Sequence, residues 1–149
     1  INTDELLKNV TMVSQTTYLF DETIEDNLRI AKPDATQEEI EAACRMASVH
    51  EFILSLPDGY KTRVGALGDN LSAGEKQRIG LARAFLRGSE WILLDEPTSN
   101  VDSINEGIIL KALQEQKRKK SILLVSHRES TMAIADRIYR VKDGRMAEI

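Results

Sequence analysis

The sequence of 149 residues has few of the features that define several protein classes. It contains one cysteine, Cys44, which excludes an intramolecular disulfide and is compatible with a reducing compartment. No apolar run approaches the ~20 residues that a membrane-spanning helix needs. The net charge is −4, so the chain has no excess of basic residues for binding phosphates. We therefore do not expect nucleic acid as a partner.

The start of the sequence also lacks two features. The opening "INTDELLKNV" has no initiator methionine and no secretory signal, and it leads almost at once into an apolar run. We therefore expect this chain to be a fragment of a longer protein. The remaining composition, 42% hydrophobic and 30% charged, is that of a soluble globular domain long enough to bury a core.

A glycine-rich phosphate-binding loop is absent as well. The pattern G-x-x-x-x-G-K-[ST] occurs nowhere in the sequence. The most similar segment, "GDNLSAGEK" from Gly68, has five residues between its glycines and Glu75 where the lysine must stand. The element that most often holds nucleotide phosphates is therefore missing from these residues.

Three short apolar runs predict buried strands of a parallel sheet. They are "VTMVSQ", "WILLDE" and "ILLVSH", and helical stretches separate them. Each run ends in polar residues: Gln15, then Asp95 with Glu96, then His127. Ligands of parallel α/β sheets bind beyond the carboxyl ends of the strands, so we expect these four side chains at one edge.

Local signals place the helices and turns between these strands. Thr36 followed by Glu39, and Ser72 followed by Glu75, have the spacing of capping boxes that open helices. The second helix extends through about Leu86 and ends at Gly88. A short helix over residues 49–56, a loop over 62–70, a short helix from about residue 129 and a hairpin turning at residues 143–144 complete the prediction.

The helix that opens at Ser72 is a candidate anion site. The first N–H groups of a helix lack partners within the helix, and the helix dipole adds positive potential there. Gly74 has no Cβ, so a phosphate can approach the backbone, and the Ser72 hydroxyl is a further donor. The alternative is purely structural, with Ser72 as an N-cap and the apolar residues of the helix facing the core.

The polar strand ends suggest hydrolytic chemistry. Asp95, at the end of a buried strand, is suited to hold Mg²⁺ beside triphosphate oxygens, and Glu96 is suited to act as general base on an attacking water. His127 is suited to orient that water or donate to a γ-phosphate, and Gln15 to contact the metal or water. The structural alternatives are a strand-to-turn junction at "DEP" and ordinary polar contacts for the other two.

The order and spacing of "Q", "LSAGEKQR", "ILLDEPTS", "NVD" and the later histidine resemble the nucleotide-binding domain of ABC (ATP-binding cassette) transporters, over essentially the whole chain. The resemblance implies an α/β fold: a partial P-loop NTPase (ABC ATPase) fold with a parallel sheet, an inserted helical subdomain and a C-terminal β-hairpin. It divides the chain into residues 1–16 (first core strand and Q-loop), 17–88 (helical subdomain with signature motif) and 89–149 (core lobe). The site residues it implies are Gln15 (Q-loop, catalysis and Mg²⁺), Leu71, Ser72, Ala73, Gly74 and Glu75 (signature motif), Asp95 and Glu96 (Walker B), Asp102 (D-loop) and His127 (switch).

The resemblance also implies a function and partners. The segment "LPDGYKTRVGALGDNLSAGE" is most similar to exporter-type domains. The resemblance therefore implies ATP and Mg²⁺ as cofactors, and a second nucleotide-binding domain and a transmembrane domain as partners. It implies the cytoplasmic face of the cell membrane as location. The sequence departs from the family at Ala73 in the signature motif, in "SNVD", and at Arg63 and Ala66, where exporters often have acidic residues. A soluble ABC ATPase that does not transport, and a binding fragment without enzymatic activity, are the alternatives.

The absent phosphate loop predicts that this chain alone neither binds ATP tightly nor hydrolyses it. Several charge-assisted bonds of roughly 1.5–3 kcal/mol each would be missing. The family's phosphate-loop strand lies inside the sheet, so we also expect unpaired backbone groups on a neighbouring strand.

Overall fold

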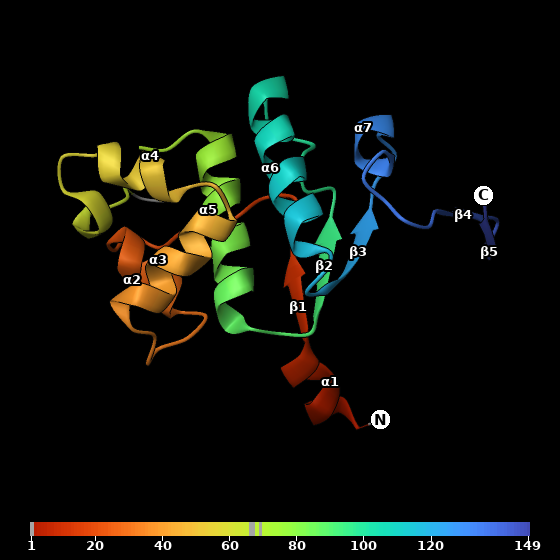
Figure 1. The fold of residues 1–149 in the computed structure, drawn as a ribbon, viewed down its shortest axis with the longest axis horizontal. Helices are drawn as coiled ribbons and strands as arrows, with labels where there is room; N and C mark the ends of the chain where they lie inside the picture. Colours follow the sequence, from red (N-terminus) through yellow and green to blue (C-terminus); the bar gives the residue numbers. More distant parts are fainter. Residues whose placement is uncertain (1, 66–67, 69) are drawn as a thin grey trace.

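A computed structural model of the chain describes residues 2–65, 68 and 70–149. It has the expected mixed α/β architecture, with a helical region beside a three-stranded parallel sheet and a separate C-terminal hairpin (Figure 1). Among the described helices, none has both the length and the apolar character needed to cross a membrane.

The three apolar runs form the predicted parallel sheet. Its strands are β1 (Val10–Val13), β2 (Trp91–Asp95) and β3 (Ser121–Val125), in the order β1-β2-β3. β2 is therefore central, and its last residue pairs with the last residue of β3, Asp95 with Val125. This register brings the carboxyl ends of β2 and β3 to the same edge, as the sequence predicts.

The two faces of the sheet differ in burial. Ile92 and Leu94 point into the same core as Ile109 and Leu113 of helix α6 (Ser103–Gln116). On the other face, four apolar side chains are 51% to 58% exposed: Met12, Trp91, Leu123 and Val125. Parallel sheets normally have both faces covered, so this face is bare within the described chain. The outer edge of β3 likewise pairs with no described strand, which agrees with the expected unpaired backbone groups.

The helical region begins and ends its helices where local signals predict. Both capping boxes are formed, at Thr36 and at Ser72, with reciprocal bonds between the cap and the glutamate three residues later. Gly88 ends the second of these helices in the left-handed conformation, with φ of 75°. The elements of this region are α2 (Ile24–Arg29), α3 (Gln37–Met46), α4 (His50–Ser55), a 3₁₀ turn η1 (Gly59–Lys61) and α5 (Ala73–Arg87).

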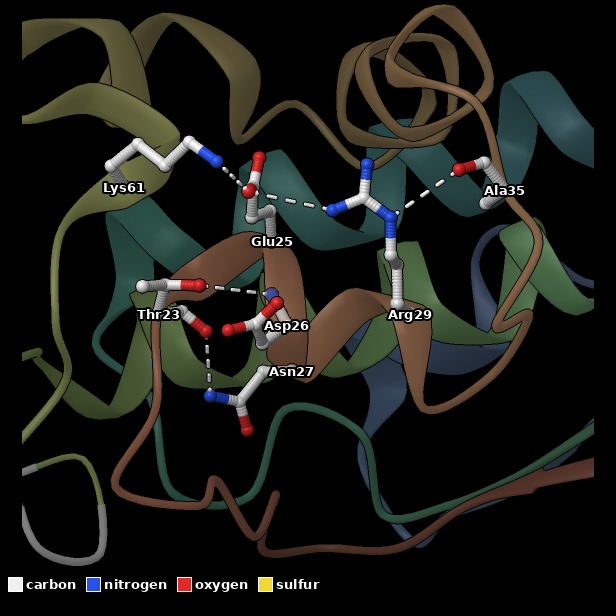
Figure 2. A network of polar contacts seen from close by, with 7 residues as sticks. All are labelled: Thr23, Glu25, Asp26, Asn27, Arg29, Ala35 and Lys61. Atoms are coloured by element: carbon white, nitrogen blue, oxygen red, sulfur yellow. Dashed lines mark hydrogen bonds and ion pairs between the residues drawn. The ribbon is translucent and has the colours of Figure 1, made fainter.

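A buried glutamate joins several of these elements. Glu25 on α2, with a side chain only 7% exposed, forms ion pairs with Lys61 of η1 and with Arg29 one turn further along α2 (Figure 2). Arg29 also donates to the carbonyl of Ala35, and Thr23 caps α2 by accepting from the Asp26 N–H. Two cations therefore compensate the buried carboxylate and hold α2 against its neighbours.

The chain ends depart more from the sequence prediction. The segment before β1, which we expected to enter the strand almost at once, forms helix α1 (Thr3–Asn9), capped by the Asn2 side chain. After β3 come α7 (Glu129–Met132) and the predicted hairpin of β4 (Tyr139–Lys142) and β5 (Arg145–Glu148). All eight strand residues of the hairpin are exposed, and it lies away from the three-stranded sheet (Figure 1).

Candidate functional site

Glu96 lies directly after β2 in an unusual backbone conformation. Its φ is 48°, in the left-handed region that non-glycine residues rarely adopt. Its N–H donates to the Val125 carbonyl at 2.8 Å, and its carbonyl accepts from the Ser99 hydroxyl at 3.1 Å. Such strained conformations persist only where the surrounding structure enforces them, and they are frequent in functional sites.

The Glu96 carboxylate contacts His127, a residue that the sequence predicts at the same edge of the sheet. His127 Nδ1 lies 2.7 Å from Glu96 Oε1. Glu96 is 9% exposed, whereas the imidazole is 86% exposed. The second carboxylate oxygen, Oε2, is buried and has no hydrogen-bond partner in the described chain. An unpaired buried carboxylate oxygen is costly, so this atom is suited to accept a proton or hydrogen bond from a bound molecule.

Asp95 and Gln15 lie at the same end of the sheet but form no such pair. Asp95 is half-buried at the last position of β2, and Gln15 is exposed two residues after β1. Neither side chain forms a hydrogen bond or ion pair with a described residue, and the described residues contain no cluster of three or more histidine, cysteine or acidic ligands for a metal. Mg²⁺ at a nucleotide site needs only one or two carboxylates, since phosphates and water supply the rest. Asp95 therefore fits a shared site and not a complete metal cage.

At the start of α5, the side chains of the candidate anion site are engaged with each other. Ser72 Oγ accepts from the Glu75 N–H at 3.2 Å, and Glu75 Oε1 accepts from the Ser72 N–H at 3.1 Å. Leu71 is buried, whereas Ser72 and Ala73 are exposed. The capping alternative is thus present in the structure, and it leaves this turn accessible to a second molecule.

Gly74 is in contact with helix α6. A Cβ on Gly74 would clash with the side-chain amide of Asn105, so any other residue there would require that amide to move. Asn105 in turn donates from its backbone N–H to Oδ1 of Asp102, the N-cap of α6, at 2.7 Å. This backbone hydrogen bond lowers the pKa of the Asp102 carboxyl.

The predicted residues therefore form two groups. The first, here named the strand-end cluster, contains Asp95, Glu96 and His127. The second, here named the helix-start cluster, contains residues 71–75 with Asn105 and Asp102. Sequence reasoning missed Asn105, although its position three residues after an N-cap aspartate is a signal for a helix start.

The loop before α5 departs from the exporter pattern at two residues, Arg63 and Ala66. Ala66 lies outside the described residues, and Arg63 forms an ion pair with Asp21 at 3.3 Å.

Comparison with known proteins agrees with this geometry. A family model described as "ABC transporter" matches residues 1–99. A probable ABC transporter ATP-binding/permease protein of Haemophilus influenzae is 58% identical over 147 residues, which cover 99% of this chain and 27% of that protein. A putative multidrug export ATP-binding/permease protein of Bacillus subtilis is 46% identical over 144 residues, covering 97% of this chain and 25% of that protein.

A solved structure is similar over the same length. It is that of a bacterial Atm1-family ABC exporter with ATP bound, with a TM-score of 0.88 and 34% identity, and the match covers 99% of this chain and 26% of that chain. The present chain thus spans about a quarter of the length of these proteins. The family match, the identities and the shared fold together show that this chain belongs to the ABC transporter family.

Proposed function

We propose that this chain is part of the ATP-hydrolysing domain of an ABC exporter, in which hydrolysis drives transport across a membrane. The observation that carries the proposal is the contact between His127 and Glu96, which leaves Glu96 Oε2 buried and unpaired at the carboxyl end of the central strand. That arrangement suits a general base, because one oxygen is held by His127 and the other forms no hydrogen bond that a water entering the site would have to displace.

In this proposal the residues of the strand-end cluster have different roles in ATP hydrolysis. Glu96 Oε2 accepts the proton of the attacking water, while the bond to His127 keeps the carboxylate oriented. Asp95 would hold Mg²⁺, with Gln15 as a further ligand. When bound, the metal would neutralise charge on the triphosphate oxygens.

The helix-start cluster would serve a different nucleotide. We propose that two such domains, identical or related, enclose two ATP molecules between them. Residues 71–75 of one domain, with Asp102 nearby, would then face phosphates held by the phosphate loop of the other. The exposed position of Ser72 and Ala73 supports this, since a turn buried within its own chain would be inaccessible to a partner.

The phosphate-binding loop of the ATPase domain would come from a separate lobe. The bare face of the sheet, the unpaired edge of β3 and the isolated hairpin all offer surface for a strand and helix that these residues do not include. In the complete exporter we propose, residues 1–16, 17–88 and 89–149 form the Q-loop strand, the helical subdomain and the core lobe. Membrane helices would contact the region near Gln15 from the cytoplasmic face.

Replacing Glu96 with glutamine in the complete exporter tests the proposed base. The amide keeps the shape and the hydrogen-bonding capacity of the side chain but cannot accept the water's proton. We expect ATP turnover to be lost and ATP binding to be retained, measured by phosphate release and by equilibrium titration. Unchanged turnover would remove Glu96 from this role.

Titration of the 149-residue chain with nucleotide tests its incompleteness. We expect no tight binding by the chain alone, and binding when a separately produced phosphate-loop lobe is added. Turnover by the pure chain would contradict the proposal. If neither the chain nor the mixture responds to nucleotide, a binding fragment without enzymatic activity becomes the better explanation.

A further inference from the structure

Arg128 connects its own loop to two other segments around the strand-end cluster through its guanidinium, and its backbone N–H bonds within the loop. Its Nη2 forms an ion pair with Oε2 of Glu106 on α6 at 2.8 Å. Its Nη1 donates to the carbonyl of Thr98, in the turn after β2, at 3.3 Å. Its backbone N–H donates to the Ser126 hydroxyl at 3.0 Å.

Two of these three segments adjoin Glu96 and His127, the residues that are in contact. Thr98 follows Glu96 by two residues, and Arg128 directly follows His127. Glu106 is only 12% exposed, so the Arg128 guanidinium is its recorded charge partner in a nearly buried position on α6. Arginine suits this position, since its planar fork presents several donors in a rigid arrangement, whereas lysine is a single flexible charge.

The His127 imidazole forms few contacts with the described chain. It is 86% exposed, and its contact with Glu96 is the one hydrogen bond recorded for it in the described chain. The distance between the imidazole and Glu96 therefore depends on where the loop backbone places His127. Arg128, the next residue, connects that backbone to the turn after β2 and to α6.

We propose that Arg128, held by Glu106, is a positioning residue that keeps His127 Nδ1 within hydrogen-bond distance of Glu96 Oε1. Its part in catalysis rests on the proposed function, whereas its part in the geometry does not. The alternative role is purely structural, with the ion pair only stabilising the attachment of α6. The two roles differ in what happens to the imidazole when the pair is broken.

Nitrogen-15 NMR of the two imidazole rings in the 149-residue chain distinguishes these roles. An ionised Glu96 can only accept, so Nδ1 of a neutral His127 must carry the proton. We expect the Nδ1–H tautomer for His127 at alkaline pH. In the Arg128→Gln and Glu106→Gln variants we expect most of that population to be lost in favour of Nε2–H. Arg128→Lys should give an intermediate result, and Arg118→Gln, a change at an exposed arginine outside the network, should have no effect.

The second histidine is an internal control for folding. His50 is buried, and its Nδ1 lies 2.7 Å from the Tyr60 hydroxyl, in the helical region. If His50 keeps its signals and His127 keeps the Nδ1–H tautomer in Arg128→Gln, the proposal is overturned. If that variant loses the His50 signals, Arg128→Lys takes its place and an unchanged His127 tautomer overturns the proposal.

Turnover in the complete exporter separates this proposal from the function on which it rests. Arg128→Lys should lower kcat by about tenfold to hundredfold with KM little changed, because misplacement by about 1 Å has effects of that size. A normal kcat in this variant would refute the catalytic part. The NMR experiment uses no nucleotide, so a protein without ATPase activity would still give its answer.

Discussion

Replacing Gly74 with alanine tests why the helix-start cluster contains a glycine. The added Cβ would overlap the Cγ, Oδ1 and Nδ2 atoms of Asn105 in the present arrangement. Asn105 Nδ2 also donates to Asp102 at 3.1 Å, so moving the amide breaks that bond. Overpacking of this kind lowers the free energy of unfolding by about 1–3 kcal/mol, and the higher helix propensity of alanine offsets about 0.8–1 kcal/mol of that loss. We expect a net loss of up to about 2 kcal/mol in the free energy of unfolding.

Urea denaturation of the 149-residue chain measures this loss, and thermal denaturation should show about 2–4 °C per kcal/mol at this chain length. The double variant Gly74→Ala with Asn105→Ala should recover most of the loss, because the clash needs both side chains. The recovery appears as a coupling energy of about 1 kcal/mol in a double-mutant cycle. Gly107→Ala is the matched control. Gly107 lies on α6, and a Cβ there meets nothing within 4 Å. Alanine at this position should raise the free energy of unfolding by about 0.8–1 kcal/mol.

A Gly74→Ala variant that is as stable as Gly107→Ala, with no coupling to Asn105, would refute the packing explanation. The glycine would then have to be explained by something outside the chain. Close approach of a phosphate to the backbone is the explanation that the sequence offers. The experiment therefore separates a requirement of the fold from a requirement of the ligand at one position.

Two further predictions concern stability. Burial raises the pKa of the Cys44 thiol from 9.0 to about 11, so the unfolded chain releases this proton first as pH rises. The free energy of unfolding should be unaffected by this group below pH 9 and fall by about 2–3 kcal/mol toward pH 11, and urea denaturation of Cys44→Ala should lack that component. In the chain alone, amides of β4 and β5 should exchange with solvent much faster than those of β2, because an isolated two-stranded hairpin is marginally stable. Strong protection of the hairpin in hydrogen-exchange mass spectrometry would contradict its isolation.

Features that depend on neighbouring residues were predictable from the sequence. The capping boxes at Thr36 and Ser72 and the left-handed end at Gly88 each involve residues within three positions of one another. The parallel strands were predictable because buried strands need apolar runs of a characteristic length. Helix α1 was missed because its two leucines are adjacent and give no helical period. Its stability comes from the Asn2 cap, acidic residues in its first turn and Lys8 in its last.

The convergence of Glu96 and His127 was predictable for a different reason. Parallel strands deliver their carboxyl ends to one edge, so residues far apart in sequence become neighbours by topology alone. That rule gives the edge but not the contact. Sequence carries no signal that His127 bonds one oxygen of Glu96 while the other remains unpaired, since this depends on the left-handed backbone at Glu96.

Arg128 was beyond the reach of sequence reasoning because its partners lie on other elements. Asn105 has a local signal in its spacing from the Asp102 cap, but its closeness to Gly74 on α5 has none. Their positions in the fold nevertheless have a common consequence. Asn105 touches Gly74 in the helix-start cluster, and the next residue, Glu106, holds Arg128 beside the strand-end cluster. Both contacts come from the first turn of α6, which begins at its Asp102 cap.

A displacement of that turn would therefore change the two clusters together. If the helix-start cluster faces the nucleotide of a partner domain, binding there would act on Gly74, then Asn105 and the start of α6. The same movement would act through Glu106 and Arg128 on the loop that carries His127. The two clusters need no direct contact for this, since one rigid helical turn touches both. In physical terms the first turn of α6 lies next to both the surface offered to a partner, through Asn105, and the loop that carries His127, through Glu106 and Arg128.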